Sequence, residues 1–317
     1  MYKLTSNIVI ADRYRFKGVV GCESISTWDA LTDTASLTVP KKIEWQKKPL
    51  NFGNNPILRK ENPLSISVGY DGINEKWFDG YITEIKAGIP VQVNCQDALF
   101  LLKRGEFVKS YKSVSLKTLL TDMIGGVLPF EVTADYDLGQ FRTIDRPTPA
   151  QVIDKLRQDF FIRFWCRGGT LYAGLPIVPK LQTTHKIKFI IDNRLEYIRK
   201  DDVKILLKGV IMMPNDKKIE IEIGDKDGEV RTFHKYNISE IEMRRLMQQE
   251  IEGLKYEGYR GSFTTFLRPN IQHGDIVILP TVYNLDTVEG GKYIVKKVKS
   301  FKDLEARQEI ELERRIL

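Results

Sequence analysis

The residues of this chain that could do chemistry are few and lie far apart in the sequence. Its histidines are His185, His234 and His273, and their spacing is not that of metal ligands. There is no G-x-S-x-G elbow, no phosphate-binding loop and no dinucleotide-binding glycine pattern. The acidic pair Asp201 and Asp202 could in principle serve glycoside hydrolysis, but a solvated turn is the better interpretation. We therefore expect no catalytic, cofactor-binding or metal-binding residue, and no enzyme.

Two lysine-rich segments are candidates for nucleic-acid binding. The first, KKIEWQKK at 41–48, places Trp45 among cations, as single-strand nucleic-acid binders do, but the sequence offers no second aromatic platform beside it. The second, IVKKVKSFK at 294–302, alternates lysine with valine, which is typical of the solvated face of a strand or of a protected sheet edge. The formal charge of +7 arises from 49 basic and 42 acidic residues, which favours a mixed surface over a nucleic-acid footprint.

The cysteines and the apolar segments indicate a soluble chain that folds in a reducing cytoplasm. Cys22, Cys95 and Cys166 are odd in number and widely spaced, so they predict buried free thiols rather than a disulfide framework or a zinc site. The N-terminus lacks the long apolar core of a signal peptide. The longest apolar-rich segment, 203–213, contains two lysines and is too short to span a bilayer.

Two stretches of the chain each predict a three-stranded antiparallel meander. In 64–104 and in 274–315, apolar and polar residues alternate in three runs, and glycine, proline or asparagine separates the runs. The middle runs, KWFDGYITEIKAG and EGGKYIVKKVKSF, compare well by eye, and the final runs also alternate. We therefore predict an internal duplication of this meander, with chance similarity of two β-rich segments as the alternative.

Other segments predict the elements between and before the two meanders. Strands are expected within 7–27 and 32–39, and 41–63 is expected to be a long loop of functional or interfacial character. Thr148, Pro149 and Gln151 form a capping box with proline at the first helical position, and Ser239 begins a second capping box. The remaining expected elements are a helix at 115–124 ended by a left-handed Gly125, a hairpin turning at Gly168 and Gly169, a strand pair at 185–198, strands at 203–212, 217–224 and 229–237, and a helix at about 239–254.

The order of these segments resembles the central hub proteins of contractile tail baseplates, which are the phage late control gene D family and the hub part of type VI secretion spikes. The resemblance covers nearly all 317 residues, and it rests on the order of the motifs rather than on any one of them. The motifs are LTDTASLTVP (31–40), VGY (68–70), WFDGYITEI (77–85), VNCQD (93–97) leading into LLKR, RPTPAQVIDKL (146–156), GGTLYAG (168–174), YEGYRGSFTTF (256–266), HGDIV (273–277), GKYIVKKV (291–298) and RQEIEL (307–312).

This resemblance implies a mainly β, α+β chain that acts by symmetric assembly. It implies a homotrimer in which each chain supplies two similar tube-type β-barrel domains, so that three chains form a pseudo-six-fold ring. The implied domains are 1–105 (first barrel), 106–200 (a middle α+β insertion) and 201–317 (second barrel, with the helix at about 239–254). The ring would adapt a six-fold tail tube to a three-fold spike.

The resemblance also implies partners and a location. The expected partners are further copies of the chain, the tail tube or its initiator, the central spike, other baseplate proteins, and DNA that passes through the lumen without being read. The expected location is the baseplate of a phage or prophage virion tail, assembled in the cytoplasm of the bacterial host. Longer relatives carry a fused enzymatic, spike or peptidoglycan-binding domain, and we expect none in this chain.

Two other functions stay open on the sequence alone. The first is a stand-alone β-barrel module that binds polysaccharide or nucleic acid, in which exposed aromatic residues such as Trp45 would stack on the ligand. The second is a cell-wall hydrolase whose catalytic carboxylates the sequence does not reveal. Salt-dependent oligonucleotide binding would favour the first, and clearing of peptidoglycan by the purified protein would favour the second.

Overall fold

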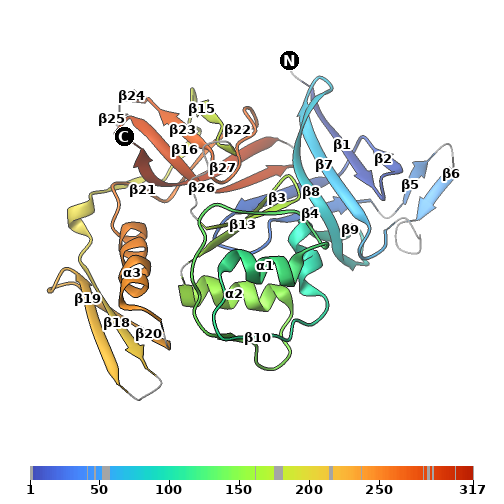
Figure 1. The fold of residues 1–317 in the computed structure, drawn as a ribbon. Helices are drawn as coiled ribbons and strands as arrows, with labels where there is room; N and C mark the ends of the chain where they lie inside the picture. The colour runs from blue at the N-terminus through green and yellow to red at the C-terminus, as the bar shows by residue number, and fades with distance from the viewer. Residues whose placement is uncertain are drawn as a thin grey trace.

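The protein is mainly β, and most of its strands belong to one large curled sheet that crosses the upper part of Figure 1. The helices lie below this sheet. The combination of these helices with a majority of strands confirms the expected α+β, mainly β class. The computed structural model describes residues 3–40, 42–45, 48–51, 58–160, 162–174, 181–213, 217–236, 238–280, 282–283, 286–287, 289–303 and 305–316.

The N-terminal half of the large sheet contains the first predicted meander. Strands β7, β8 and β9 pair antiparallel in that order, β1 pairs with β7, and β4 joins β9 to β3. The alternate apolar residues of these strands, such as Ile66, Ile82 and Val93, are buried in one cluster inside the curl. The bounds are β1 Leu4–Ile10, β2 Tyr14–Phe16, β3 Gly21–Thr27, β4 Thr34–Val39, β7 Pro63–Tyr70, β8 Ile73–Lys86 and β9 Val91–Gln96.

The C-terminal half of the sheet contains the second predicted meander. Strands β23, β26 and β27 pair antiparallel in that order, and β22 and β21 pair with β27. A second cluster of buried side chains, including Phe263, Tyr293 and Ile310, fills this half. The bounds are β21 Gly258–Arg260, β22 Ser262–Phe266, β23 Ile276–Leu279, β24 Val282–Tyr283, β25 Asp286–Thr287, β26 Gly291–Lys302 and β27 Ala306–Ile316.

The two halves repeat one strand order. In the first half, the neighbours run β3, β4, β9, β8, β7, and in the second they run β16, β22, β27, β26, β23. Every pair in both sets is antiparallel, and the strands follow one another along the chain in the same sequence. The duplication predicted from the two meanders therefore extends to five strands at the level of topology.

The halves are joined because β3 of the first pairs with β26 of the second, from Cys22 opposite Lys302 to Thr27 opposite Lys297. Neither half forms a closed barrel through its described strand pairs. The two-barrel architecture and the division at 105 and 200 therefore stay predictions.

The strand pair expected at 185–198 is wrong. The short strands of this segment do not pair with one another: β15 runs parallel to β23, β16 pairs with β22, and β17 pairs with β21. Periodicity shows that a segment is extended but not which strand lies beside it, so these long-range partners were not predictable. The bounds are β15 Thr184–Lys186, β16 Asp192–Asn193 and β17 Glu196–Ile198, followed by the 3-10 turn Lys200–Asp202.

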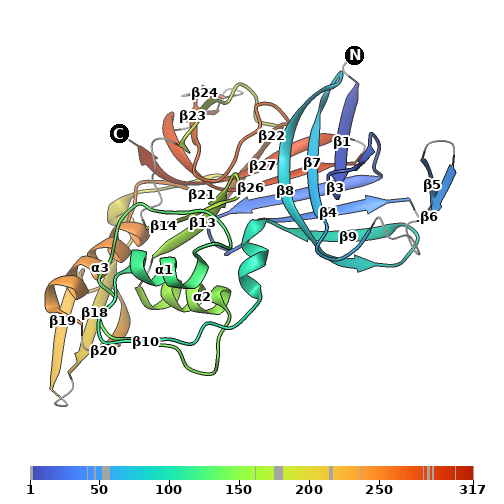
Figure 2. The same ribbon diagram turned by 45° about the vertical axis from the view of Figure 1, so that its right-hand side comes forward.

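A small α+β module lies below the junction of the two halves (Figure 2). Helices α1 and α2 pack against the hairpin of β13 and β14, which turns at Gly168 and Gly169, both with positive φ, as predicted. Thr148 and Gln151 exchange hydrogen bonds in the predicted capping box. The bounds are β10 Ser110–Tyr111, α1 Leu116–Ile124, β11 Phe130–Val132, β12 Phe141–Arg142, α2 Pro149–Phe160, β13 Arg163–Arg167 and β14 Thr170–Gly174.

One predicted cap in this module is wrong. Gly125 follows α1 with φ of −56°, and the left-handed residue is the next one, Gly126, with φ of 93°. The Gly125 amide still donates to the Thr121 carbonyl, but its ψ of 118° already takes the chain out of the right-handed region, and the left-handed residue comes one position later than expected.

The predicted elements of 203–254 form a three-stranded sheet covered by one helix. Strand β18 lies between β19 and β20, and α3 packs its buried face, including Met243 and Leu246, in the same hydrophobic cluster as α1 and α2. Ser239 caps α3 by accepting from the Glu242 amide. The bounds are β18 Ile205–Met212, β19 Lys218–Gly224, β20 Glu229–Tyr236 and α3 Glu240–Leu254.

The segment expected to be a long loop contains a short hairpin. Strands β5 (Lys42–Trp45) and β6 (Lys48–Asn51) pair with one another and project from the side of the large sheet in Figures 1 and 2. The high density of lysine, asparagine and proline obscured these two strands in the sequence. The side chain of Trp45 lies outside the described part of the structure.

Candidate functional site

The most unusual polar region of the molecule is a buried junction where both sheet halves meet the β13–β14 hairpin. Its residues come from six separated segments, which the fold brings together. We define the polar junction as Ser26, Asp33, Asp97, Arg167, His185, Gln272, His273 and Asp275.

The centre of the polar junction is a buried ion pair between Arg167 and Asp275. Arg167 Nη2 lies 2.7 Å from Asp275 Oδ1, and the Arg167 Nε–H donates to Gln272 Oε1 at 3.1 Å. Asp275 is 3% exposed, and its Oδ2 also accepts from the Gln272 amide and lies 3.2 Å from His185 Nε2. Burial alone would raise the pKa of Asp275, but the hydrogen bond from His185 and the Arg167 guanidinium outweigh it and hold that pKa below its usual range.

A neutral histidine connects this pair to the first sheet half. His273 is buried, its Nδ1 lies 2.6 Å from Ser26 Oγ on β3, and its ring packs edge-on against Trp28. Burial, followed by the nearby Arg167 charge, lowers the pKa of His273 to about 3. His273 is therefore uncharged at neutral pH, and it acts as a hydrogen-bonding spacer between the halves.

Two carboxyl groups on the N-terminal side complete the polar junction. Asp33 Oδ1 accepts from the Thr27 amide at 2.9 Å, and Asp97 accepts from the amides of Asp33 and Leu99. Burial raises the pKa of Asp97 to about 7. Burial and then the neighbouring Asp97 charge raise the pKa of Asp33 well above its usual range.

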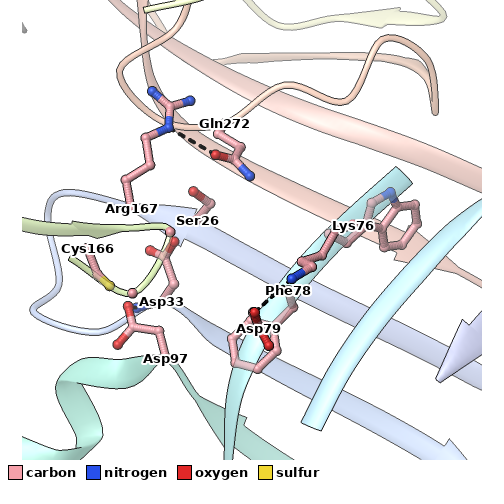
Figure 3. Close-up of a pocket in the computed structure, with 12 residues that line it drawn as sticks. Ser26, Asp33, Lys76, Phe78, Asp79, Asp97, Cys166, Arg167 and Gln272 are labelled. Atoms are coloured by element: carbon pink, nitrogen blue, oxygen red, sulfur yellow. Dashed lines mark hydrogen bonds and ion pairs between the residues drawn. The ribbon is translucent and has the colours of Figure 1, made fainter. Parts of the chain in front are cut away.

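A cavity of about 220 Å³ adjoins the polar junction (Figure 3). Figure 3 shows Asp33, Asp97 and Cys166 grouped on one side of it, and the exposed Lys76–Asp79 ion pair on β8 facing them from the other. Burial raises the pKa of the Cys166 thiol, so the thiolate that nucleophilic chemistry needs is disfavoured.

The geometry of the polar junction favours a structural role over a chemical one. Both oxygens of Asp97 are used by backbone amides, and both oxygens of Asp275 are used by side chains and backbone. Within the described residues, no group of three or more His, Cys, Asp or Glu side chains is placed to hold a metal ion. What the arrangement does is hold six segments of chain in one register.

We expect the Asp33→Asn variant to unfold with a different pH dependence from the wild type. Because the folded-state pKa of Asp33 is raised, its contribution to stability is present at low pH and is lost as pH rises above about 4, the unfolded value. Asparagine keeps an oxygen for the Thr27 amide and removes the charge. At pH 8 the variant should therefore be more stable than the wild type, and the difference should shrink as the pH falls towards 4.

Urea unfolding between pH 4 and pH 8 measures this difference. The matched control is Asp12→Asn, which removes an exposed carboxylate and should leave the curve parallel to that of the wild type. Parallel curves for Asp33→Asn and the wild type would show that folding does not raise the pKa of Asp33.

The sequence-predicted candidates separate into two groups in the structure. His185 and His273 come together in the polar junction, whereas His234 lies on β20, and Asp201 and Asp202 are exposed in a 3-10 turn, as the solvated-turn interpretation predicts. The three cysteines are buried and free, as predicted. Sequence reasoning missed Asp33, Asp97, Arg167 and Asp275, whose local patterns resemble ordinary turns and caps.

The lysine-rich strand segment is solvated but is not a sheet edge. β26 is a central strand, and Lys297 and Lys299 form half-exposed ion pairs with Glu311 and Glu23 on the neighbouring strands. The expected solvated face is confirmed, and the protected-edge interpretation is wrong. The side chains of the other lysine-rich segment, 41–48, lie outside the described part of the structure.

A second polar contact joins the halves through the turn 266–271. Gln308 is fully buried, and its Nε2 donates to the carbonyls of Phe266, Leu267 and Pro269 while its Oε1 accepts from the Ile271 amide. The turn so held reaches β8 of the first half. There, the Asn270 amide donates to Glu75 Oε2 at 3.1 Å.

Comparison with known proteins gives matches among solved structures alone. No family model matches the chain, and no curated protein sequence matches it. The tail protein from Neisseria meningitidis MC58 superposes with a TM-score of 0.71 at 12% identity, covering 99% of this chain and 97% of that one. The 43 kDa tail protein of prophage MuSo2 from Shewanella oneidensis gives 0.66 at 11% identity, covering 98% of each chain.

A third match extends the comparison beyond phages. The E. coli c3393 protein, a component of the type VI secretion system with structural similarity to T4 tail proteins, gives a TM-score of 0.62 at 8% identity, covering 98% of this chain and 77% of that one. At these identities, the likeness shows the fold. The chain therefore has the fold of phage tail proteins and of a type VI secretion component, which is the group that its sequence resembles.

Proposed function

We propose that the chain is a structural hub protein of a contractile tail baseplate. Three copies form a ring with pseudo-six-fold symmetry, which joins the six-fold tail tube to the three-fold central spike and surrounds the channel. The observation that carries this proposal is the repeated five-strand order of the two sheet halves.

A chain that carries one topology twice presents two similar units, so three chains around a three-fold axis present six. Such a ring offers six similar surfaces to a tube and keeps three-fold symmetry toward a spike. The fold shared with phage tail proteins and a type VI secretion component supports this use of the repeat.

The proposed ring uses the domains expected from the sequence. Residues 1–105 and 201–317 would supply the two tube-type barrels, and 106–200 would widen the trimer. The segment 184–193 also belongs to the sheet of the second unit. Its first strand, β15, pairs with β23, and its second strand, β16, pairs with β22.

The proposal also assigns partners and a location. The partners are the tail tube or its initiator, the central spike and other baseplate proteins, and DNA passes through the lumen without sequence-specific contacts. The ring belongs to the virion tail, is assembled in the cytoplasm of the bacterial host, and catalyses no reaction. In the described part of the chain, no helix has the length and apolar character needed to cross a membrane.

Electron microscopy of the purified protein tests this function. We expect end-on class averages with three-fold symmetry and six similar lobes around a central opening. The six lobes follow from the two repeated units per chain, so a trimer with three lobes would contradict the use of the repeat. Two-fold particles, or compact particles without an opening, would contradict the ring itself.

A further inference from the structure

The geometry points to a specific contact between copies: the outer edge of β16 in one copy pairs with residues 83–86 of β8 in the next. This inference rests on the proposed trimer and names the surfaces that hold it together. Its basis is a difference between the two repeated units in the neighbours of their equivalent strands.

The long middle strand of each meander has a different number of neighbours. In the second unit, β27 lies along one edge of β26, and β23 and β3 share the other edge, at 291–294 and 297–302. In the first unit, β9 lies along one edge of β8 and β7 along the other, and both pair with Tyr81. Equivalent strands in a repeat should have equivalent surroundings, so among the described strands β8 lacks one neighbour.

The unoccupied stretch of β8 is short and well defined. Pairing on the β7 edge ends at Ile82, which exchanges backbone hydrogen bonds with Glu61 and Asn62. In the described structure, no strand pairs with that edge at 83–86. This stretch corresponds to the part of β26 that pairs with β3, because both directly precede the turn into the last strand of the meander.

The missing neighbour of β8 is the counterpart of β3 in the second unit. In the first unit, β3 is the last strand after β9 and β4, and its outer edge pairs with β26. In the second unit, β16 is the last strand after β27 and β22, and its outer edge pairs with no other strand in the described structure. Two strand edges therefore have no partner within the described ranges of the chain, and the repeat assigns each to the other.

A single chain cannot join these edges, because they lie in different units that already meet through β3 and β26. A second copy can join them, since head-to-tail contacts between two different surfaces close into a ring when the rotation between copies allows it. An unpaired strand edge presents backbone donors and acceptors to another chain. The contact between copies would then repeat the contact within each chain.

The charges on the two edges are complementary in an antiparallel register. β8 carries exposed Glu84 and Lys86, and the β16 segment carries exposed Asp192 and Arg194. Placing Lys86 opposite Asp192 also places Arg194 opposite Glu84. Within the chain, the equivalent contact has the same character, since Lys299 of β26 pairs with Glu23 of β3 at 2.9 Å.

Apolar side chains flank both edges. Phe189, Ile191 and Phe266 are exposed beside β16, where Phe189 and Phe266 pack edge to face. Ile89, which is 83% exposed, follows β8 in the turn to β9. The contact would cover these side chains, so that buried apolar contacts would border the charged strand pair.

Cross-linking tests the contact. The double variant Lys86→Cys with Asp192→Cys, treated with a short bismaleimide, should give covalent dimers and trimers on a denaturing gel. The native cysteines are buried, so they should not react. The matched control is Lys76→Cys with Asp192→Cys, because Lys76 is exposed on the same strand in the part that already pairs with β7, and it should give monomers.

Light scattering on the same samples separates the two proposals. A trimer in which the 86/192 pair cross-links no better than the control would overturn this contact and leave the hub function standing. A protein that stays monomeric would overturn both. A cross-linked trimer that is absent from the control supports both.

A charge exchange gives an independent readout. Lys86→Glu places like charges at the contact and should raise the concentration needed for trimer formation about tenfold or more, and adding Asp192→Lys should restore it. If the charged residues instead protect the edges from pairing, Lys86→Glu will leave the trimer unchanged and the inference fails.

Discussion

Replacing Arg167 with methionine is expected to lower the free energy of unfolding by about 3–5 kcal/mol. The reason is that Asp275 is 3% exposed and would keep a buried charge without its guanidinium partner at 2.7 Å. Arg167 also donates to Gln272 and to the Leu181 carbonyl, so its loss frees the segments on either side of the polar junction. Urea unfolding followed by tryptophan fluorescence measures the effect, since Trp28 packs against His273 of the polar junction and Trp165 lies on β13 with Arg167.

The control for this variant is Arg146→Met. Arg146 pairs with Glu106 at 3.0 Å but is 76% exposed, so its loss should cost no more than about 1 kcal/mol. The pH dependence provides a further check. The pKa of Asp275 is lowered in the folded protein, so the stabilisation that it gains from Arg167 is present at neutral pH and is lost as pH falls through that pKa. Similar small losses for both variants would mean that the polar junction does not hold the halves together.

Replacing Gln308 with leucine is expected to cost about 3 kcal/mol or more. Leucine has nearly the same volume but leaves the Ile271 amide and the carbonyls of Leu267 and Pro269 without their buried partner. The turn 266–271 should then lose its fixed shape, together with its contact to β8. Hydrogen exchange at the Ile271 amide reports the turn directly, and thermal unfolding reports the global effect.

The matched control for this variant is Gln248→Leu on the exposed face of α3. Gln248 donates to Glu252 at the surface, so its replacement should change the free energy of unfolding by less than about 0.5 kcal/mol. Unchanged protection of the Ile271 amide in Gln308→Leu would show that the turn is held by packing rather than by the glutamine.

The parts of the fold that the sequence predicted are those set by short-range physics. Alternation marked the strands of both meanders, two capping boxes marked the starts of α2 and α3, and Gly168 with Gly169 marked a hairpin. Each of these signals lies within a few residues of the structure that it specifies. The order of segments added the resemblance to tail hub proteins, and the solved structures with this fold agree with it.

The parts that were not predicted depend on contacts between distant segments. The pairing of β3 with β26 and the separate partners of β15, β16 and β17 have no local signature, because one extended segment is compatible with many neighbours. The polar junction is of the same kind. Arg167 ends a strand, Asp97 caps the 3-10 helix Ala98–Lys103, and Asp275 lies in a turn, so each looks ordinary until the fold brings them together.

The most direct test of the trimeric ring is the native mass in solution, measured by light scattering over a wide range of protein concentration. The chain has a mass of 36.6 kDa, and the ring requires three copies, which is 109.8 kDa. We expect the measured mass to rise to this value and to stay there as concentration increases. A mass that remains at 36.6 kDa throughout the range would contradict it.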